Sequence, residues 1–285
     1  MTMPCPTRAL LRALFCMFVA ALLLRPQPAR ADLMLFPTRV VFEKNQRSAQ
    51  VDLVNNGTEA ATYRISLVNR RMSETGELQP ADTPQDGELF ATTMVQFSPR
   101  QVTLQPGTSQ TVRVMIRKPA DLTPGEYRSH LQFQRLPDAK GASSVETKGG
   151  DTNEIGIFLN ALVGASIPVI VRHDDTSASV SLSHLAMQQS AAGAQPVLAL
   201  QFDRTGNRSV YGDVAVHFTP QGSAEQVVAR AAGVAVYTPN ALRRASVPLQ
   251  PSPGTALAHG TLRATYRERP EAGGALLAEA TLVLP

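Results

Sequence analysis

The chain of 285 residues contains no tryptophan and only two cysteines, Cys5 and Cys16, both near its N-terminus. Beyond residue 31 there is therefore no cysteine to form a disulfide, to bind a metal through a thiolate or to act as a nucleophile. No apolar run beyond residue 31 reaches the roughly 18 residues of a membrane-spanning helix, so we expect no stable membrane insertion of that part. These absences exclude a multi-span transporter and a domain held together by disulfides.

Residues 1–31 are predicted to be a secretory signal peptide. Arg8 and Arg12 precede an apolar core from Ala13 to Leu24, and an A-x-A cleavage site ends at Ala31. An uncleaved N-terminal anchor is the alternative, although the apolar core is short for a membrane span. We therefore expect an exported protein whose mature chain begins at Asp32.

The charge balance gives no indication of a nucleic-acid partner. The sequence has 27 Lys and Arg against 23 Asp and Glu, but four of the arginines and none of the acids lie in residues 1–31. The remaining chain is therefore neutral. Proteins that bind nucleic acid usually carry a basic patch, so we expect no nucleic acid among the partners.

Short alternating runs separated by turn residues predict an all-β fold. The expected strands of a first unit lie at 33–42, 50–54, 61–68, 96–104, 110–116, 126–136 and 154–172. Those of a second unit lie at 178–185, 196–202, 212–218, 226–237, 246–249, 260–266 and 275–284. Seven strands in about 110 residues is the size of an immunoglobulin-like sandwich. We therefore expect two such domains, at residues 32–173 and 174–285, with a polar loop at 137–153 in the first.

Residues 154–172 alternate over an unusually long distance. Every odd position from Ile155 to Val171 is apolar, which corresponds to a strand of about 56 Å, whereas most strands have about 3–10 residues. Pro168 has no backbone N–H and belongs on an edge strand or at a bulge. Either this segment is an ordinary buried core strand, or it presents an apolar row and a free backbone edge to another chain.

Residue patterns typical of enzymes are missing from the sequence. It has no G-x-S-x-G and no glycine-rich phosphate loop, and its five histidines do not have metal-ligand spacing. The segment His173-Asp174-Asp175 fits a solvated linker better than a cation site. We therefore expect a protein that is not an enzyme and that needs no cofactor and no metal.

Four segments of the first unit match motifs of a known family. Residues 38–42 read T-R-V-V-F, and residues 99–113 follow P-x4-L-x-P-G-x2-Q-x-V-R. Residues 126–137 read E-Y-R-S-H-L-Q-F-Q-R-L-P, and the long alternating run ends at 167–172. Together these segments resemble the PapD-like periplasmic chaperones of pilus assembly, across the whole of the first domain.

This resemblance implies a fold and a function. It implies two immunoglobulin-like β-sandwich domains in an L-shaped arrangement, and a periplasmic chaperone of a chaperone-usher pathway for fimbrial biogenesis. Such a chaperone binds pilus subunits that lack their last strand, completes them by donor-strand complementation, which is a form of strand addition, and delivers them to an outer-membrane usher. The alternative is a secreted structural or adhesive immunoglobulin-like protein without chaperone activity.

The resemblance also implies roles for individual residues. Arg39 matches the cleft arginine that binds the carboxylate of the subunit's C-terminus, and Glu126 and Arg172 match an inter-domain ion pair. Pro168 occupies the position of a second cleft cation, a lysine in the family, so another group must replace that lysine or the anchor is weaker. The residues that correspond to the donor strand are Ile155, Ile157, Leu159, Ala161 and Val163.

Overall fold

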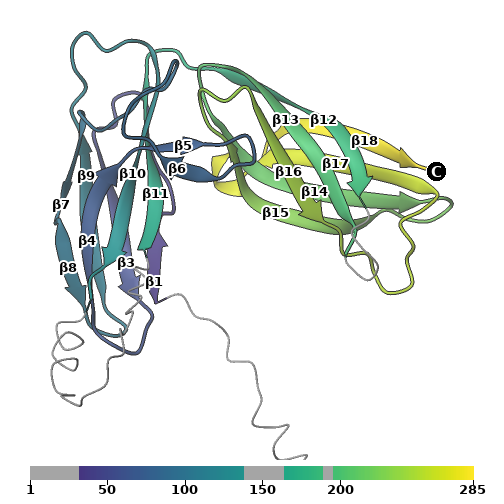
Figure 1. Ribbon diagram of the computed structural model, residues 1–285, viewed down its shortest axis with the longest axis horizontal. Helices are drawn as coiled ribbons and strands as arrows, with labels where there is room; N and C mark the ends of the chain where they lie inside the picture. Colours follow the sequence, from purple (N-terminus) through teal and green to yellow (C-terminus); the bar gives the residue numbers. More distant parts are fainter. Residues whose placement is uncertain (1–31, 138–163, 189–194) are drawn as a thin grey trace, which may run out of the picture.

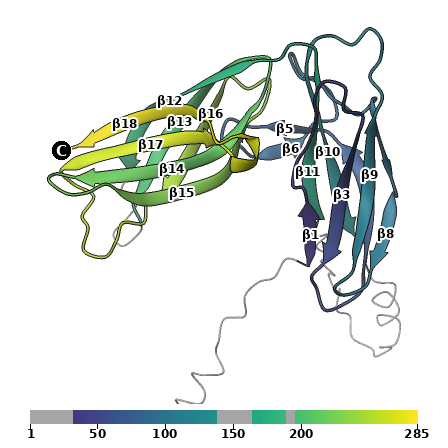
Figure 2. The same cartoon turned by 180° about the vertical axis from the view of Figure 1, so that it is seen from behind.

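The computed structural model describes residues 32–137, 164–188 and 195–285. They form two β-sandwich domains whose long axes meet at an angle, so that the molecule has an L shape in both views (Figure 1; Figure 2). The all-β fold with two immunoglobulin-like domains that the sequence predicts is confirmed. Within the described residues, no helix is long and apolar enough to cross a membrane.

The first domain packs two sheets around one core. The four-stranded sheet has the order β1 (Leu33–Phe36), β3 (Ser48–Asn55), β9 (Ser109–Ile116) and β7 (Val95–Ser98). The five-stranded sheet has the order β2 (Val40–Phe42), β11 (Gly164–His173), β10 (Gly125–Arg135), β4 (Ala61–Val68) and β8 (Gln101–Leu104). The buried residues between these sheets form a single apolar cluster that extends in sequence from Val40 to Val171.

The second domain has its own core, made of residues between Leu182 and Leu284. One sheet has the order β12 (Ala178–Gln188), β13 (Val197–Gly206) and β16 (Leu242–Pro248). The other has the order β15 (Gln226–Val236), β14 (Val210–Pro220), β17 (Gly260–Glu268) and β18 (Leu276–Leu284), and a 3-10 turn, η1 (Pro270–Ala272), connects its last two strands. Each domain therefore buries its apolar surface independently.

Two prolines divide segments that the sequence analysis treats as single runs. The run 33–42 breaks at Pro37 into β1 and β2, which belong to different sheets of the first domain. The run 96–104 breaks at Pro99 into β7 and β8, which also belong to different sheets. Because proline has no N–H for a ladder bond, each one marks the point at which the chain leaves one sheet for the other.

Strand β11 is paired on both sides along only part of its length. It is antiparallel to β10 from residue 164 to residue 173, but parallel β2 accompanies it only at Val169, Ile170 and Val171. Among the described residues, Pro168 therefore has a neighbouring strand on one side only, as expected for a proline in a sheet. The odd positions Ile167, Val169 and Val171 face the core of the first domain.

A small apolar cluster joins the two domains. Met72 and Ile170 of the first domain pack against Ala235 and Tyr237 of the second. Met72 belongs to a hairpin, β5 (Arg70–Met72) and β6 (Leu78–Pro80), that projects from the first domain toward the second (Figure 1). The backbone oxygen of Met72 accepts a hydrogen bond of 2.9 Å from Asn240 Nδ2. These contacts hold the hairpin of the first domain against the second domain.

Candidate functional site

Arg39 lies in the short connection between β1 and β2, at the cleft between the domains. Its Nη1 donates a hydrogen bond of 3.2 Å to the hydroxyl of Tyr237. Its guanidinium carbon lies 4.4 Å from the ring centroid of Tyr211 and 5.4 Å from that of Tyr237, distances typical of cation–π contacts. A cation of the first domain is thus held by two aromatic rings of the second.

The cavity beside Arg39 has a volume of about 730 Å³. The first domain lines it with residues of the β1–β2 connection and with Arg172, and the second domain with Ser209, Tyr211 and Arg269. Arg39 makes no ion pair with any described residue. A guanidinium has five donors and no acceptor, so an anionic group that enters this cavity can bind Arg39 without displacing an ion-pair partner, although Glu43, Glu268 and Glu271 also line the cavity.

Glu126 and Arg172 lie directly opposite each other on β10 and β11. Arg172 Nε is 3.0 Å from Glu126 Oε2, and the Glu126 side chain is fully buried. The second carboxylate oxygen of Glu126 accepts a hydrogen bond from the hydroxyl of Ser209, which belongs to the second domain. The buried carboxylate thus has a partner in each domain, as a buried charge requires.

The contact that Glu126 makes with the second domain is with a neutral group, the hydroxyl of Ser209. Arg172 also forms an ion pair with Glu43 of the first domain. One cation therefore already balances two carboxylates, and a third carboxylate at the position of Ser209 would be repelled. A hydroxyl donor satisfies Glu126 without adding charge.

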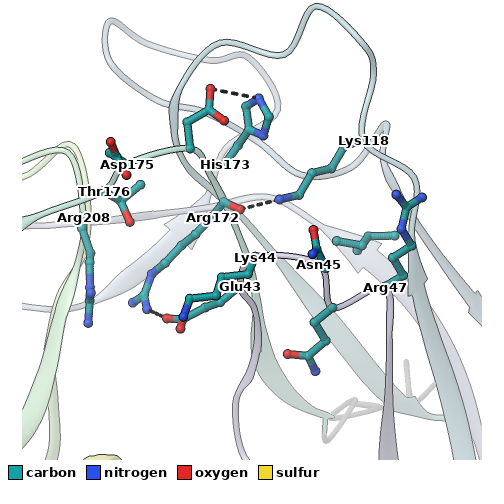
Figure 3. Close-up of a pocket in the computed structure, with 13 residues that line it drawn as sticks. Glu43, Lys44, Asn45, Arg47, Lys118, Arg172, His173, Asp175, Thr176 and Arg208 are labelled. Atoms are coloured by element: carbon teal, nitrogen blue, oxygen red, sulfur yellow. Dashed lines mark hydrogen bonds and ion pairs between the residues drawn. The ribbon is translucent and has the colours of Figure 1, made fainter.

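The Arg172–Glu43 pair lies next to a second cavity, of about 590 Å³. Figure 3 shows Glu43 and Arg172 pointing toward each other, with Arg208 of the second domain nearby. Lys118 Nζ donates a hydrogen bond of 2.6 Å to the backbone oxygen of Arg172 (Figure 3). Because Glu43, Arg172 and Arg208 line both cavities, this charged cluster lies where the last strand of the first domain leads into the second.

Two buried basic residues of β10, Arg128 and His130, lie behind Tyr237. Arg128 is 5% exposed, and its guanidinium carbon lies 4.2 Å from the Tyr237 ring centroid. Its Nε and Nη1 have no hydrogen-bond partner among the described residues, and burial lowers its pKa. His130 is fully buried, and this burial, with Arg128, Arg70 and Arg39 nearby, lowers the pKa of His130 to about 3. His130 is therefore neutral at physiological pH.

The structure brings together Arg39, Glu126 and Arg172, which the sequence indicates, along one side of the junction between the domains. The donor residues Ile155, Ile157, Leu159, Ala161 and Val163 lie outside the described residues, so their role stays a prediction. Sequence reasoning missed Tyr211, Tyr237, Ser209 and Arg128. Tyr211, Tyr237 and Ser209 lie in none of the quoted motifs, and Arg128 lies within the motif at 126–137 without any sign of a role. The positions of all four at the cleft depend on how the domains dock.

A Ser–His–Asp grouping on β12 and β13 does not have the arrangement of a catalytic triad. Ser183 Oγ donates to the carboxylate of Asp203 and lies 3.0 Å from Nδ1 of the adjacent His184. In a triad the carboxylate orients the imidazole, which in turn takes the serine proton. Here the carboxylate binds the serine itself, so this grouping does not activate a nucleophile.

Comparison with known proteins finds a matching family model and solved structures with a similar fold. Residues 41–142 match a family described as Fn3-like domain, and no curated protein sequence matches the chain. The solved structure of the YadV chaperone has 12% identity and a TM-score of 0.44, over 89% of this chain and 100% of that one. The class 5 fimbriae chaperone CfaA has 15% identity and a TM-score of 0.41, over 89% and 99%.

A third solved structure, the CupB2 chaperone of Pseudomonas aeruginosa, has 10% identity and a TM-score of 0.41, over 87% of this chain and 98% of that one. All three of these solved structures are of chaperones. At these identities the likeness concerns the fold.

Proposed function

We propose that this protein is a periplasmic chaperone that binds fimbrial subunits and delivers them to an outer-membrane usher. The observation that carries the proposal is Arg39, a cation without an ion-pair partner among the described residues, in the wall of an inter-domain cavity. The terminal carboxylate of a bound subunit is a ligand of the required charge. The similarity of the chain to the class 5 fimbriae chaperone CfaA, and to chaperones solved in complex with a tip subunit or a pilin, supports the same function.

The edge of β11 is the second part of the proposed binding surface. Between residues 164 and 168, β11 lacks a neighbour on one side among the described residues, and unpaired backbone at a sheet edge can pair with another chain. In the sequence, the odd row that faces the core at Ile167 continues back to Ile155. We propose Ile155, Ile157, Leu159, Ala161 and Val163 as the row donated to the subunit.

The energies explain why an anchor is needed. Burial of the four large side chains in this row contributes about 6–12 kcal/mol, and association costs an estimated 4–15 kcal/mol. Side-chain burial alone therefore only about offsets the cost of association. A charge-assisted hydrogen bond from Arg39 adds about 1.5–3 kcal/mol and also sets the register of the bound strand.

The test is co-expression of the full chain with the candidate subunit encoded beside its gene, followed by purification from the periplasm. We expect a soluble one-to-one complex that is lost in Arg39→Ala. Arg113→Ala is the matched control, because Arg113 lies exposed on β9, away from the cleft, and should leave the complex intact. An unchanged thermal midpoint of Arg39→Ala would show that the variant folds.

The other outcomes separate the alternatives. A complex that survives Arg39→Ala would keep the chaperone function but place the anchor at another residue. No complex, with a subunit that folds unaided, would favour a secreted adhesive or structural immunoglobulin-like protein. That alternative predicts self-association or binding to host surfaces and has no need of a free Arg39.

A further inference from the structure

The hydroxyl of Tyr237 has a proton that no described residue accepts. Its oxygen accepts a hydrogen bond from Arg39 Nη1 at 3.2 Å, and a guanidinium has no acceptor. The tyrosine proton must therefore point away from Arg39, and it makes no hydrogen bond to another described residue. Because Tyr237 is 6% exposed and belongs to the apolar cluster between the domains, this donor is held in a fixed position next to the cation.

The charge around Tyr237 favours an anion. Arg39 contacts its hydroxyl, and the guanidinium of Arg128 lies 4.2 Å from its ring centroid. Neither arginine forms an ion pair with a described residue, and Arg128 has two buried nitrogens without a partner. The two guanidinium groups beside Tyr237 create a positive potential at its hydroxyl. This potential would stabilise an anionic group bound there.

The neighbouring tyrosine, Tyr211, differs in the charge around its hydroxyl. The hydroxyl of Tyr211 accepts a long hydrogen bond of 3.5 Å from Arg269. Arg269 is in turn 3.0 Å from Glu271 and 3.9 Å from Asp213. The cation that contacts the Tyr211 hydroxyl is therefore balanced within the protein, whereas Arg39, which contacts the Tyr237 hydroxyl, has no ion-pair partner among the described residues.

Strand β11 cannot supply a second donor at residue 168. Pro168 lies opposite His130 in the β10–β11 register, and directly opposed residues of an antiparallel pair share one face of the sheet. Proline has no N–H, and His130 is fully buried. Arg128, two residues before His130, lies on the same face, beneath the ring of Tyr237.

We propose that Tyr237 is the second hydrogen-bond donor to the carboxylate bound by Arg39, and that Arg128 supplies the second charge from behind the ring. This inference rests on the proposed function, in which the ligand is the terminal carboxylate of a subunit. The carboxylate would then be held by one residue from each domain, so its binding would also fix how the domains are docked. Arg128 acts through Tyr237 and is a positioning residue.

The experiment compares two peptides with the sequence of the last twelve or so residues of the co-encoded subunit, one with a free C-terminal carboxylate and one with a C-terminal amide. Each carries a fluorophore at its N-terminus, and its affinity for the full chain is measured by anisotropy. The readout is the ratio of the two affinities, which a loss of general packing would not change. We expect the wild type to prefer the acid and Arg39→Ala to bind both peptides equally.

Tyr237→Phe removes only the hydroxyl and keeps the ring between the domains. We expect it to lower the acid-over-amide preference about tenfold, the effect of one hydrogen bond to a charged group. Tyr63→Phe is the control and should leave the preference unchanged, because it removes a buried hydroxyl from β4, opposite Arg135 and away from the cleft. If Tyr237→Phe retains the wild-type preference while Arg39→Ala loses it, the inference about Tyr237 is wrong, but Arg39 still binds the carboxylate. If the wild type binds neither peptide or binds both equally, the anchor and this inference both fail.

Discussion

The hydroxyl of Ser209 makes the polar contact that joins the buried carboxylate of Glu126 to the second domain. It also accepts a hydrogen bond of 3.0 Å from the backbone N–H of Thr238. Ser209 is 3% exposed, so water cannot easily replace its hydroxyl. Substitution Ser209→Ala removes both interactions and leaves a buried carboxylate oxygen without its inter-domain donor.

The expected loss follows from these two contacts. A hydrogen bond to a charged group contributes about 1.5–3 kcal/mol, and a buried N–H left without an acceptor costs about 1–3 kcal/mol. Thr238 is only partly buried, so water can partly replace the lost acceptor of its backbone N–H. We therefore expect Ser209→Ala to lower the free energy of unfolding by about 2–4 kcal/mol in total.

Calorimetry and urea unfolding of the full chain would measure this loss. A chain of this size should show a decrease in Tm of about 2–4 °C per kcal/mol. The matched control is Ser179→Ala, which removes an exposed hydroxyl 2.7 Å from Thr205 Oγ1 on the surface of the same domain. Exposed substitutions of this kind change stability by about 0.5 kcal/mol or less.

The reasoning would be refuted if Ser209→Ala lost no more stability than Ser179→Ala. That result would mean that Glu126 is satisfied within the first domain, by Arg172 alone. The docking of the two domains would then depend on the apolar cluster around Tyr237 and not on the polar contact.

Two further predictions concern His130 and Arg128, the buried basic residues behind Tyr237. The folded-state pKa of His130, about 3, lies below its ordinary value of 6.5, so between these values the unfolded chain binds more protons and stability rises with pH. Lowering the pH from 7 to 5 should therefore cost the wild type about 2 kcal/mol more than His130→Phe in urea unfolding; equal pH dependence would contradict a buried neutral imidazole. Arg128→Met should leave the free energy of unfolding unchanged or raise it by up to about 2 kcal/mol. The reason is that it removes a buried cation without an ion-pair partner among the described residues. The same variant should lower the acid-over-amide preference in the peptide assay. A loss of more than about 1 kcal/mol would instead show that Arg128 stabilises the interface through its contact with the Tyr237 ring.

Local pattern was enough to predict the architecture. The alternation of apolar residues and the spacing of turns predicted all seven strands of the second domain, because each strand must bury one face and return by a short turn. The same pattern predicted that Pro168 lies where β11 has a free side. What it did not resolve were the sheet changes at Pro37 and Pro99, since a run of apolar residues does not record which sheet a strand joins.

Arg39, Glu126 and Arg172 could be identified from the sequence because they lie within segments that resemble the motifs of a known family. Tyr237 and Ser209 were not, because their importance comes from contacts across the junction between the domains. Tyr237 meets Arg39 over a separation of 198 residues, and Ser209 meets Glu126 over 83. A hydrogen bond depends on distance and direction, and across two independently folded domains these are set by the docking of one on the other. The residues that the first domain contributes to the site could thus be identified from sequence patterns. Those that the second domain contributes could be identified only from the tertiary structure.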